Sequence, residues 1–306
     1  MDSFFFNITD TSYKVSYLYK EKKNYIKRVD ISNGIVFFDV YIYSKQTKIF
    51  KLKNLDRMVI ITVTKQGSFF IHDNINKKIY NLKKNSINIL NSSRQDLSIS
   101  LKESEKTEIF VLFIADFILK RHLSSNQNEV INFLYNNIQG DVSCDFIDTK
   151  PIDALSLYII NKILDSKSED TMASIRCEHN ILEFMIHRFN LLDILDDKLK
   201  DDEIRISKSA KNILLSSYVK PPSIKVLAHL CATNETKLKK VFKKVYNTTI
   251  YAYIQKLRLE KANLLLKDQI LNIGEISKEV GYKHQGHFSK LFFQYYAVYP
   301  KDLLKK

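Results

Sequence analysis

The sequence predicts an α+β protein with a β-rich N-terminal part and an all-helical C-terminal part. In the first 115 residues, short runs of β-branched and aromatic residues are separated by polar turns, which is typical of strands. In the last third of the chain, one apolar pattern with helical period occurs twice. Residues 222–306 carry sixteen Lys and Arg against six Asp and Glu, so most of the formal net charge of +14 lies there. This asymmetry favours an anionic partner for the C-terminal part.

Seven runs in the N-terminal part have the composition of strands. Polar pairs such as Asp73-Asn74 separate them. Regular short strands of this kind predict a β-sandwich or a small barrel. The runs cover residues 13–19, 34–43, 58–64, 68–72, 87–90, 97–100 and 109–114.

Beyond residue 115 the apolar period becomes helical, over residues 151–164 and 172–195. The apolar faces of these helices either cover the β-rich part or pair with a second copy of the chain, so a homodimer stays an open alternative. A charge-dense stretch follows at 196–202, and Pro221-Pro222 interrupts any helix. We therefore expect a β-rich domain with C-terminal helices at 1–200, a connector at 201–221 and a helical domain at 222–306.

Two similar units make up the expected helical domain, each with the spacing of a helix-turn-helix. A small residue stands at each turn, Ala232 in the first unit and Gly281 in the second, where two helices cross closely. The second turn is expected to be one residue longer. The matching positions are Leu227, Ala228, Leu238, Phe242 and Tyr246 in the first unit, and Ile276, Ser277, Phe288, Phe292 and Tyr296 in the second.

A single long helix is expected between the two units, over residues 248–266. Thr248 or Thr249 supplies its N-cap, and neither Gly nor Pro interrupts it. Such a helix holds the two units at a fixed separation. At a separation near one turn of duplex, ~34 Å, both second helices can read the same face of DNA.

The C-terminal part resembles the AraC/XylS family of bacterial transcription regulators. The resemblance covers residues 222–306 and rests on ordered landmarks rather than on one helix-turn-helix. The chain departs from the family pattern at Ala297, where Gly is usual, and at Ser277, where Ala is usual. The landmarks are Leu257 to Ala262 (LRLEKA), Ile276-Ser277, Val280-Gly281-Tyr282, His287-Phe288-Ser289-Lys290 and Pro300.

This resemblance implies a two-domain regulator. Its N-terminal domain is expected to be a cupin-like sensor for a small-molecule effector, and its C-terminal domain to bind double-stranded DNA and activate transcription through contact with RNA polymerase. Residues 221–223, residues 234–239 and the start of the long helix between the units also resemble the subgroup of the pyochelin regulator. Members of this subgroup respond to ferric siderophores, so a ferric siderophore is one candidate effector. Arg258 matches a family position that holds the two units together; we interpret its guanidinium as paired or bonded to backbone.

Residues for DNA contact are expected on the outer faces of the two recognition helices. Gln pairs with adenine, Lys with guanine, and Ser with either a base or a phosphate. Phosphate contact or plain solvation is the alternative reading of each, since half or more of protein–DNA hydrogen bonds go to the backbone. The expected residues are Thr236, Lys239 and Lys240 in the first helix and Gln285, Gly286, Ser289 and Lys290 in the second.

Enzymes and metal or cofactor proteins have little support in this sequence. The β-rich part offers His72, with His122 just beyond it, and has no His-x-His pair. His284 and His287 are expected to cap or pack the entry of a helix rather than bind metal. No nucleophile motif or phosphate-binding glycine loop occurs. We therefore expect no catalytic residues, no metal and no cofactor.

Cysteine usage and hydropathy bear on the compartment. Cys144, Cys177 and Cys231 are odd in number and widely spaced, which is typical of reduced thiols. No stretch has the apolar length of a membrane span. We expect a soluble cytoplasmic protein without a membrane partner.

Two other classes of protein remain alternatives. An architectural DNA-binding protein without a sensing role would show little preference between a selected promoter and random duplex at physiological salt. A β-domain interaction module whose tail binds a protein would tolerate replacement of Lys239 and Lys290 by Ala.

Overall fold

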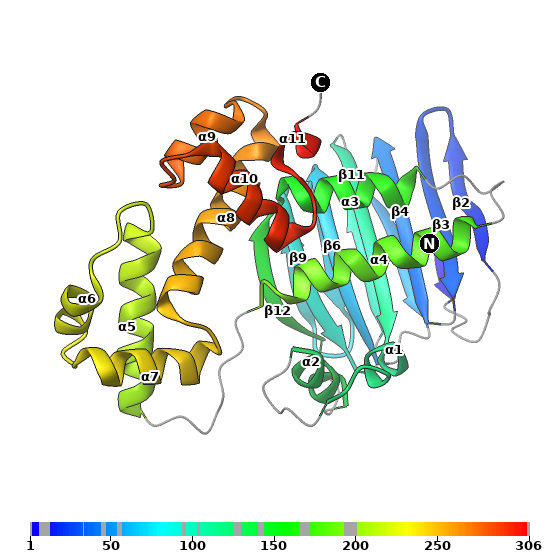
Figure 1. The fold of residues 1–306 in the computed structure, drawn as a ribbon. Helices are drawn as coiled ribbons and strands as arrows, with labels where there is room; N and C mark the ends of the chain where they lie inside the picture. Colours follow the sequence, from blue (N-terminus) through cyan, green and yellow to red (C-terminus); the bar gives the residue numbers. More distant parts are fainter. Residues whose placement is uncertain are drawn as a thin grey trace. The chain divides into compact units, whose positions relative to one another are not determined.

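A computed structural model describes residues 2–5, 13–32, 34–43, 47–53, 57–93, 96–102, 105–124, 130–139, 144–165, 172–192 and 201–304. The chain forms two compact units (Figure 1). Unit 1 consists of Met1–Ile152 and Ile159–Leu192, and unit 2 of Asp153–Tyr158 and Asp193–Lys306. The boundary expected near residue 200 falls within 193–200, outside the described residues, and the expected connector at 201–221 belongs to unit 2.

Unit 1 contains two sheets in which neighbouring strands are antiparallel, except that β1 and β5 are parallel. The smaller sheet has the spatial order β1 (Asp2–Phe5), β5 (Lys48–Lys53), β10 (Leu97–Leu101), β7 (Phe69–Asp73) and β8 (Lys78–Leu82). The larger has the order β12 (Cys144–Pro151), β9 (Ser86–Ser92), β6 (Met58–Gln66), β11 (Lys106–Ala115), β4 (Ile35–Tyr43), β3 (Asn24–Ser32) and β2 (Lys14–Glu21). The expected β-rich domain is thus confirmed, and its two packed sheets form a sandwich.

The core of unit 1 lies between the two sheets. Side chains from the smaller sheet, such as Phe50 and Phe69, pack there against side chains from the larger, such as Phe38 and Phe113. Strand β6 is buried along both of its faces, at Met58 and Ile60 as well as at Val59. A strand with both faces covered is apolar at successive positions. Strand β6 has this pattern because helices cover the side of its sheet that faces away from the smaller sheet.

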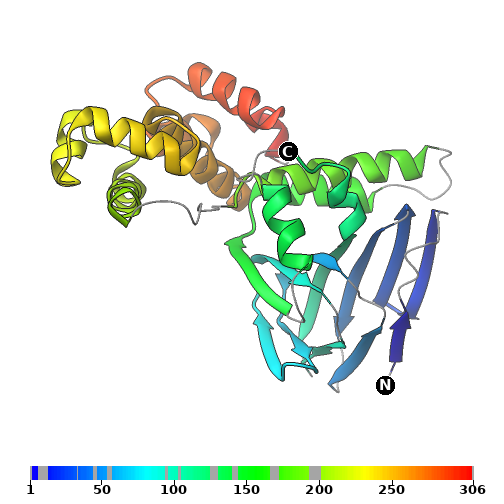
Figure 2. The ribbon, with the colours of Figure 1, turned by 90° about the horizontal axis from the view of Figure 1, so that it is seen from below.

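The helices of unit 1 lie on one side of the sheets (Figures 1 and 2). Phe184 of α4 packs edge-on against Phe110 of β11, with ring centroids 6.1 Å apart, and Phe110 contacts Phe37 of β4. These three rings form a second apolar layer between helix and sheet. The bounds are α1 (Asp116–Lys120), α2 (Val130–Gln139), α3 (Ala154–Leu164) and α4 (Ala173–Phe189), with α3 divided between the two units.

Unit 2 is dominated by helices in two similar groups joined by α8 (Figure 1). The first group packs around a core of α5 side chains, among them Ile206 and Leu214, with Leu227, Leu238 and Phe242. Thr249 caps α8 by accepting a hydrogen bond from the Ala252 N–H, as one of the two expected caps. The bounds are α5 (Asp201–Ser217), α6 (Ile224–Leu230), α7 (Glu235–Tyr246), α8 (Ile250–Asp268), α9 (Ile273–Glu279), α10 (Gln285–Tyr296) and α11 (Pro300–Leu303).

Among the described residues, no helix combines the length and the apolar character needed to cross a bilayer. The three cysteines are buried thiols.

Candidate nucleic-acid interface

The turns of the two helix-turn-helix units repeat one hydrogen-bond pattern. In the first unit, the Thr233 N–H donates to the Ala228 carbonyl and the Ala232 N–H to that of His229. In the second, the Tyr282 N–H donates to Ser277 and the Gly281 N–H to Lys278. Both are Schellman endings, which need a left-handed residue after the helix, and Ala232 and Gly281 have φ of 51° and 91°.

The length of the two turns differs by one residue, as the sequence predicts. Four residues separate α6 from α7, and five separate α9 from α10. The entry of α7 is capped by Asn234, whose side chain accepts from the Lys237 N–H at 2.8 Å. At the entry of α10, His284 is the N-cap residue, although its side chain makes no capping hydrogen bond. His287 instead packs edge-on against Tyr282, at 5.9 Å between ring centroids.

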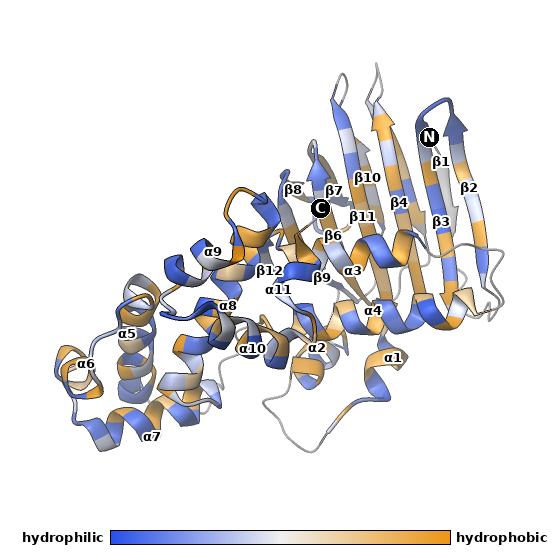
Figure 3. Cartoon of the chain, turned by 45° about the horizontal axis from the view of Figure 1, so that its top comes forward, coloured by the Kyte–Doolittle hydropathy of each residue, from blue (hydrophilic) through white to orange (hydrophobic). Residues whose placement is uncertain are grey.

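Each recognition helix buries the face that the periodicity predicts. Leu238, Phe242 and their neighbours in α7 are buried, as are Phe288, Phe292 and Tyr296 in α10. Tyr295 is 41% exposed, so of the two adjacent tyrosines Tyr296 is the core residue. Figure 3 shows the resulting mixture of hydrophilic and hydrophobic residues along α7. The opposite faces of both helices are free to meet a partner.

The sequence-expected contact residues of α7 divide into two groups. Thr236 and Lys240 are exposed and lie one turn apart, on the face opposite Leu238. Lys239 is exposed on the flank of the helix, with its Nζ 3.9 Å from Glu235 Oε2. Lys243 continues the face of Thr236 and Lys240 by a further turn. The sequence reading missed Lys243, although its spacing of seven residues from Thr236 is the signal that finds it.

The expected residues of α10 lie at its entry and on its outer face. Gln285, Gly286 and Lys290 are exposed, and Ser289 is half-buried on the flank. A Cβ at Gly286 would meet no atom within 4 Å, so open space surrounds this position. Phe293 continues the face of Gly286 and Lys290, and its ring is 40% exposed. The sequence reading also missed Phe293.

Positive charge on the outer faces is uncompensated, whereas charge on one flank of α7 is paired. Lys240, Lys243 and Lys290 make no ion pair within the described part of the chain. Lys237 contacts Asp202 of α5 at 2.6 Å, and Lys244 contacts Glu203 at 2.5 Å. The hydrogen bonds from Lys237 and Arg205 hold the pKa of Asp202 below its ordinary value. The two free lysines of α7 are therefore available to phosphates.

Arg258 of α8 braces the second unit. Its Nε donates to the Tyr218 carbonyl at 2.8 Å and its Nη2 to that of Val219 at 3.0 Å. The guanidinium lies over the Tyr282 ring at 5.2 Å. Gly281 lies against the same segment, because a Cβ there would come within 2.6 Å of the Val219 oxygen. The backbone-bonded, structural interpretation of Arg258 is confirmed.

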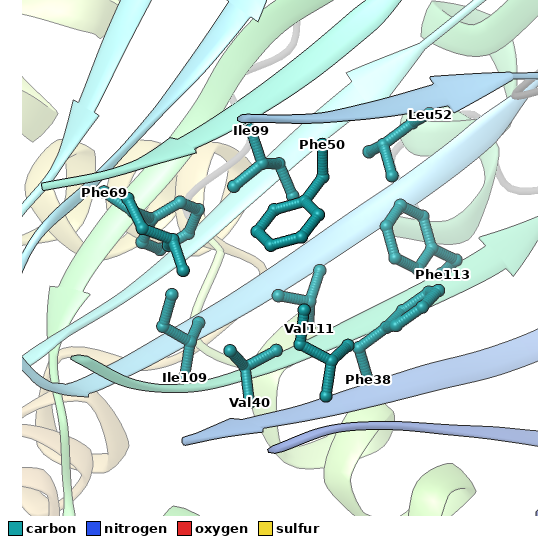
Figure 4. A pocket seen from close by; sticks show the side chains of 11 residues that line it. Phe38, Val40, Phe50, Leu52, Phe69, Ile99, Ile109, Val111 and Phe113 are labelled. Atoms are coloured by element: carbon teal, nitrogen blue, oxygen red, sulfur yellow. The ribbon is translucent and has the colours of Figure 1, made fainter. Parts of the chain in front are cut away.

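Unit 1 contains a cavity between its sheets (Figure 4). Its volume is about 30 Å³, and eleven side chains line it, all of them apolar. Phe38, Phe50 and Phe113 lie on one part of its wall, and Phe69 and Ile109 on another. Among the described residues, no group of three or more His, Cys, Asp or Glu side chains is placed to hold a metal ion.

Comparisons with known proteins agree on the C-terminal part. Residues 227–306 match a helix-turn-helix domain family. The HTH-type transcriptional regulator AlkR of Acinetobacter baylyi is 35% identical over 82 residues, which cover 27% of each chain. The Msm operon regulatory protein of Streptococcus mutans is 31% identical over 96 residues, covering 31% of this chain and 34% of that protein. Regulatory protein PchR of Pseudomonas aeruginosa is 29% identical over 78 residues, covering 26% of each chain.

The matched segment spans about a quarter to a third of the length of these curated relatives. Among solved structures, an AraC-type DNA-binding domain from Chromobacterium violaceum is 21% identical and covers 34% of this chain and 93% of that one, with a TM-score of 0.32. ToxT from Vibrio cholerae is 18% identical and covers 89% of this chain and 100% of that one, with a TM-score of 0.31. Residues 227–306, with two helix-turn-helix units that share one turn geometry, thus match a helix-turn-helix domain family and are similar in sequence to named transcription regulators.

Proposed function

We propose that the whole chain is a sequence-specific, effector-responsive transcription regulator. The observation that carries this proposal is the pair of recognition helices, each with one exposed face, held by a single helix. Helix α8 has 19 residues, or a length of about 28 Å at the usual rise per residue. This length is of the order of one duplex turn, ~34 Å, as a reader of successive major grooves requires.

The seven residues expected from the sequence remain the proposed contacts, joined by Lys243 and Phe293. Within this set, Thr236, Lys240, Gly286 and Lys290 lie on the two outer faces, and Lys239 and Ser289 on the flanks. Base contact is proposed for Thr236 and for the outer-face residues of α10, whereas Lys240 and Lys243 of α7 are proposed to contact phosphates. Phosphate contact is proposed for the flanking ones, since most side-chain bonds to DNA serve position rather than sequence.

Genome-wide mapping of DNA bound by the full-length protein tests the proposal. We expect discrete sites that share a two-part sequence, and loss of these sites in the Lys240→Ala/Lys290→Ala variant. The Lys51→Ala/Lys150→Ala variant, with the same loss of charge in unit 1, is the control and should keep them. Uniform coverage of the genome by the wild-type protein would favour an architectural DNA-binding protein instead.

The effector is proposed to bind unit 1, in the apolar cavity. Its present volume has room for roughly two waters, so a larger ligand has to displace side chains such as Phe50. The lining favours an apolar ligand over a ferric siderophore, whose iron-binding oxygens would lose hydrogen bonds there. Mapping with and without iron limitation tests the siderophore, and a rise in melting temperature with decane, absent in a Val111→Phe variant, tests the apolar ligand.

A homodimer through α4 is part of the same proposal. Exposed apolar side chains on this helix and at its N-cap follow a heptad spacing of three and four residues. They are the N-cap residue Met172 and the helix residues Ile175 and Ile186, with His179 and Leu182 in the same row. An antiparallel pairing of two copies brings Arg176 of each near Glu183 of the other, so the charges are complementary under two-fold symmetry. Ile175→Lys/Ile186→Lys should halve the mass in sedimentation, whereas Tyr251→Lys, at an exposed position of unit 2, should not.

Activation through RNA polymerase in the cytoplasm completes the proposal. Transcription in vitro from a mapped promoter, with purified polymerase, should rise when the regulator is added. A fall in transcription would make the chain a repressor while leaving its DNA binding intact.

A further inference from the structure

The outer faces of α7 and α10 differ in chemistry at equivalent positions. Residues fifty apart correspond, so Thr236, Lys240 and Lys243 match Gly286, Lys290 and Phe293. All six are exposed. The first helix thus presents a hydroxyl and two ammonium groups, whereas the second presents a glycine, one ammonium group and a phenyl ring.

The ring of Phe293 packs against a second aromatic ring. It stacks on Tyr299, with centroids 4.4 Å apart and ring planes at 19°. Tyr299 is the residue that precedes α11, and Lys301 lies over its ring at 5.6 Å. Single exposed apolar side chains are ordinary on protein surfaces. Phe293 is distinguished from these because its ring stacks on Tyr299 and because it shares a face with Lys290, one turn away.

Gly286, two turns before Phe293, leaves the start of this face bare. Neither packing nor a left-handed backbone requires glycine there, since a Cβ would meet nothing within 4 Å and no unusual φ occurs. The bare position instead lets the backbone of α10 approach a partner more closely than α7 can at Thr236.

We propose that Phe293 is a specificity-determining residue that contacts the C5-methyl group of thymine in the half-site read by α10. The thymine methyl is the apolar group on the base edges of the major groove, and a phenyl ring offers neither charge nor hydrogen bond to a phosphate. Lys240 and Lys243 of α7 supply charge to the other half-site. The inference rests on the proposed function and assigns a different part of it to each helix. Helix α7 contributes mainly to affinity, and α10 recognises thymine.

Replacement of thymine by deoxyuridine tests the contact, because it removes the methyl group alone. The probe is a mapped operator duplex in which each thymine of the α10 half-site is replaced in turn. For the wild-type full-length protein we expect the dissociation constant to rise about fourfold at one or two positions, the factor that burial of one methyl group corresponds to. Phe293→Ala should bind the thymine duplex more weakly and show no further loss with deoxyuridine. Phe293→Leu, which keeps an apolar side chain, should retain part of the sensitivity.

Lys243→Ala is the matched control at the equivalent position of α7. It should weaken binding to thymine and deoxyuridine duplexes by the same factor and reduce the salt exponent by about 1. The inference is overturned if no single replacement weakens the wild-type protein, or if Phe293→Ala responds to deoxyuridine as the wild type does. Equal affinity of the wild type for operator and random duplex would instead overturn the proposed function.

Discussion

Ala232 and Gly281 occupy the same left-handed position in the two turns, but Gly281 alone is pressed against a neighbouring backbone. A Cβ at Gly281 would lie 2.6 Å from the Val219 carbonyl oxygen. Ala232 already carries a Cβ at φ 51°, and its residue is exposed. The two turns share one geometry but differ in what limits the residue at this position. In the first unit Ala232 is under backbone strain, and in the second unit Gly281 has no room for a Cβ.

Opposite substitutions at these two positions should have opposite effects on stability. Ala232→Gly should raise the free energy of unfolding of unit 2 by roughly 1 kcal/mol, because glycine adopts the left-handed region without a Cβ clash. Gly281→Ala should lower it by more than about 2 kcal/mol, since strain and the clash with Val219 add. Calorimetry of the full chain measures both free energies of unfolding. A loss of stability in Ala232→Gly would show that the left-handed backbone at Ala232 is not strained.

Arg258→Lys tests the brace between α8 and the segment that follows α5. Lysine lacks the planar fork that reaches two carbonyls at once, and it leaves the Val219 or Tyr218 oxygen without its donor. We expect a loss of roughly 2 kcal/mol in the unfolding of unit 2. Arg205→Lys, in an exposed ion pair with Asp202, is the control and should change stability by less than about 0.5 kcal/mol. Equal losses of stability in the two variants would show that the two backbone hydrogen bonds of Arg258 contribute no more than an exposed ion pair.

Local spacing explains why the helical part was predictable. The buried residues of α7 and α10, the longer second turn and the Thr249 cap all depend on neighbours a few residues away. Lys243 and Phe293 were missed because the contact residues were assigned from a motif at the helix entries. Both residues lie on the outer face further along their helices, beyond that motif.

Strand pairing explains why the β-rich part was predicted less completely. Seven expected runs coincide with strands, but β1, β3, β5, β8 and β12 were missed. Strand β3 contains Lys27, Arg28 and Asp30, and the Arg28–Asp30 ion pair, at 2.6 Å, neutralises two of these charges within the strand. Such partners are not visible in a hydropathy pattern. The order of strands in each sheet depends on contacts between distant segments, which no local pattern supplies.

Tyr282→Phe should be tolerated and should reduce the sensitivity of unit 2 to alkali. The Tyr282 hydroxyl is buried without a hydrogen-bond partner among the described residues. Burial raises the pKa of Tyr282 to about 12, although the nearby Arg258 acts in the opposite direction. A raised pKa means that the stability contributed by the neutral form is complete below the unfolded value near 10 and is lost as pH rises toward 12.

Denaturant titrations of the Tyr282→Phe variant at pH 8 and at pH 11 provide the measurement. At pH 8 its stability should equal or exceed that of the wild type, because an unpaired hydroxyl is removed from the interior. Between pH 10 and 12 the wild type should lose more stability than the variant. Parallel loss in both proteins would assign the alkaline transition to other groups.

Asp202 and Glu203 should limit the electrostatic attraction of α7 for DNA. Their contacts with Lys237 and Lys244 compensate two cations on the flank of the recognition helix. Asp202→Asn/Glu203→Gln should free both lysines, strengthen binding to random duplex and steepen the salt dependence by up to about 1.8 in exponent, at ~0.9 per phosphate contacted. Because the pKa of Asp202 is lowered, its ion pair is lost only as pH falls through that lowered value, so the effect should be constant between pH 6 and 8.

The control is Asp268→Asn/Glu279→Gln, which changes the net charge of unit 2 by the same amount away from α7. Binding to random duplex should be measured for both double variants across a salt series. If the two variants steepen the salt dependence equally, net charge alone accounts for the result. A larger change for Asp202→Asn/Glu203→Gln locates the effect at the recognition helix, because counterion release counts the phosphates that the freed lysines reach.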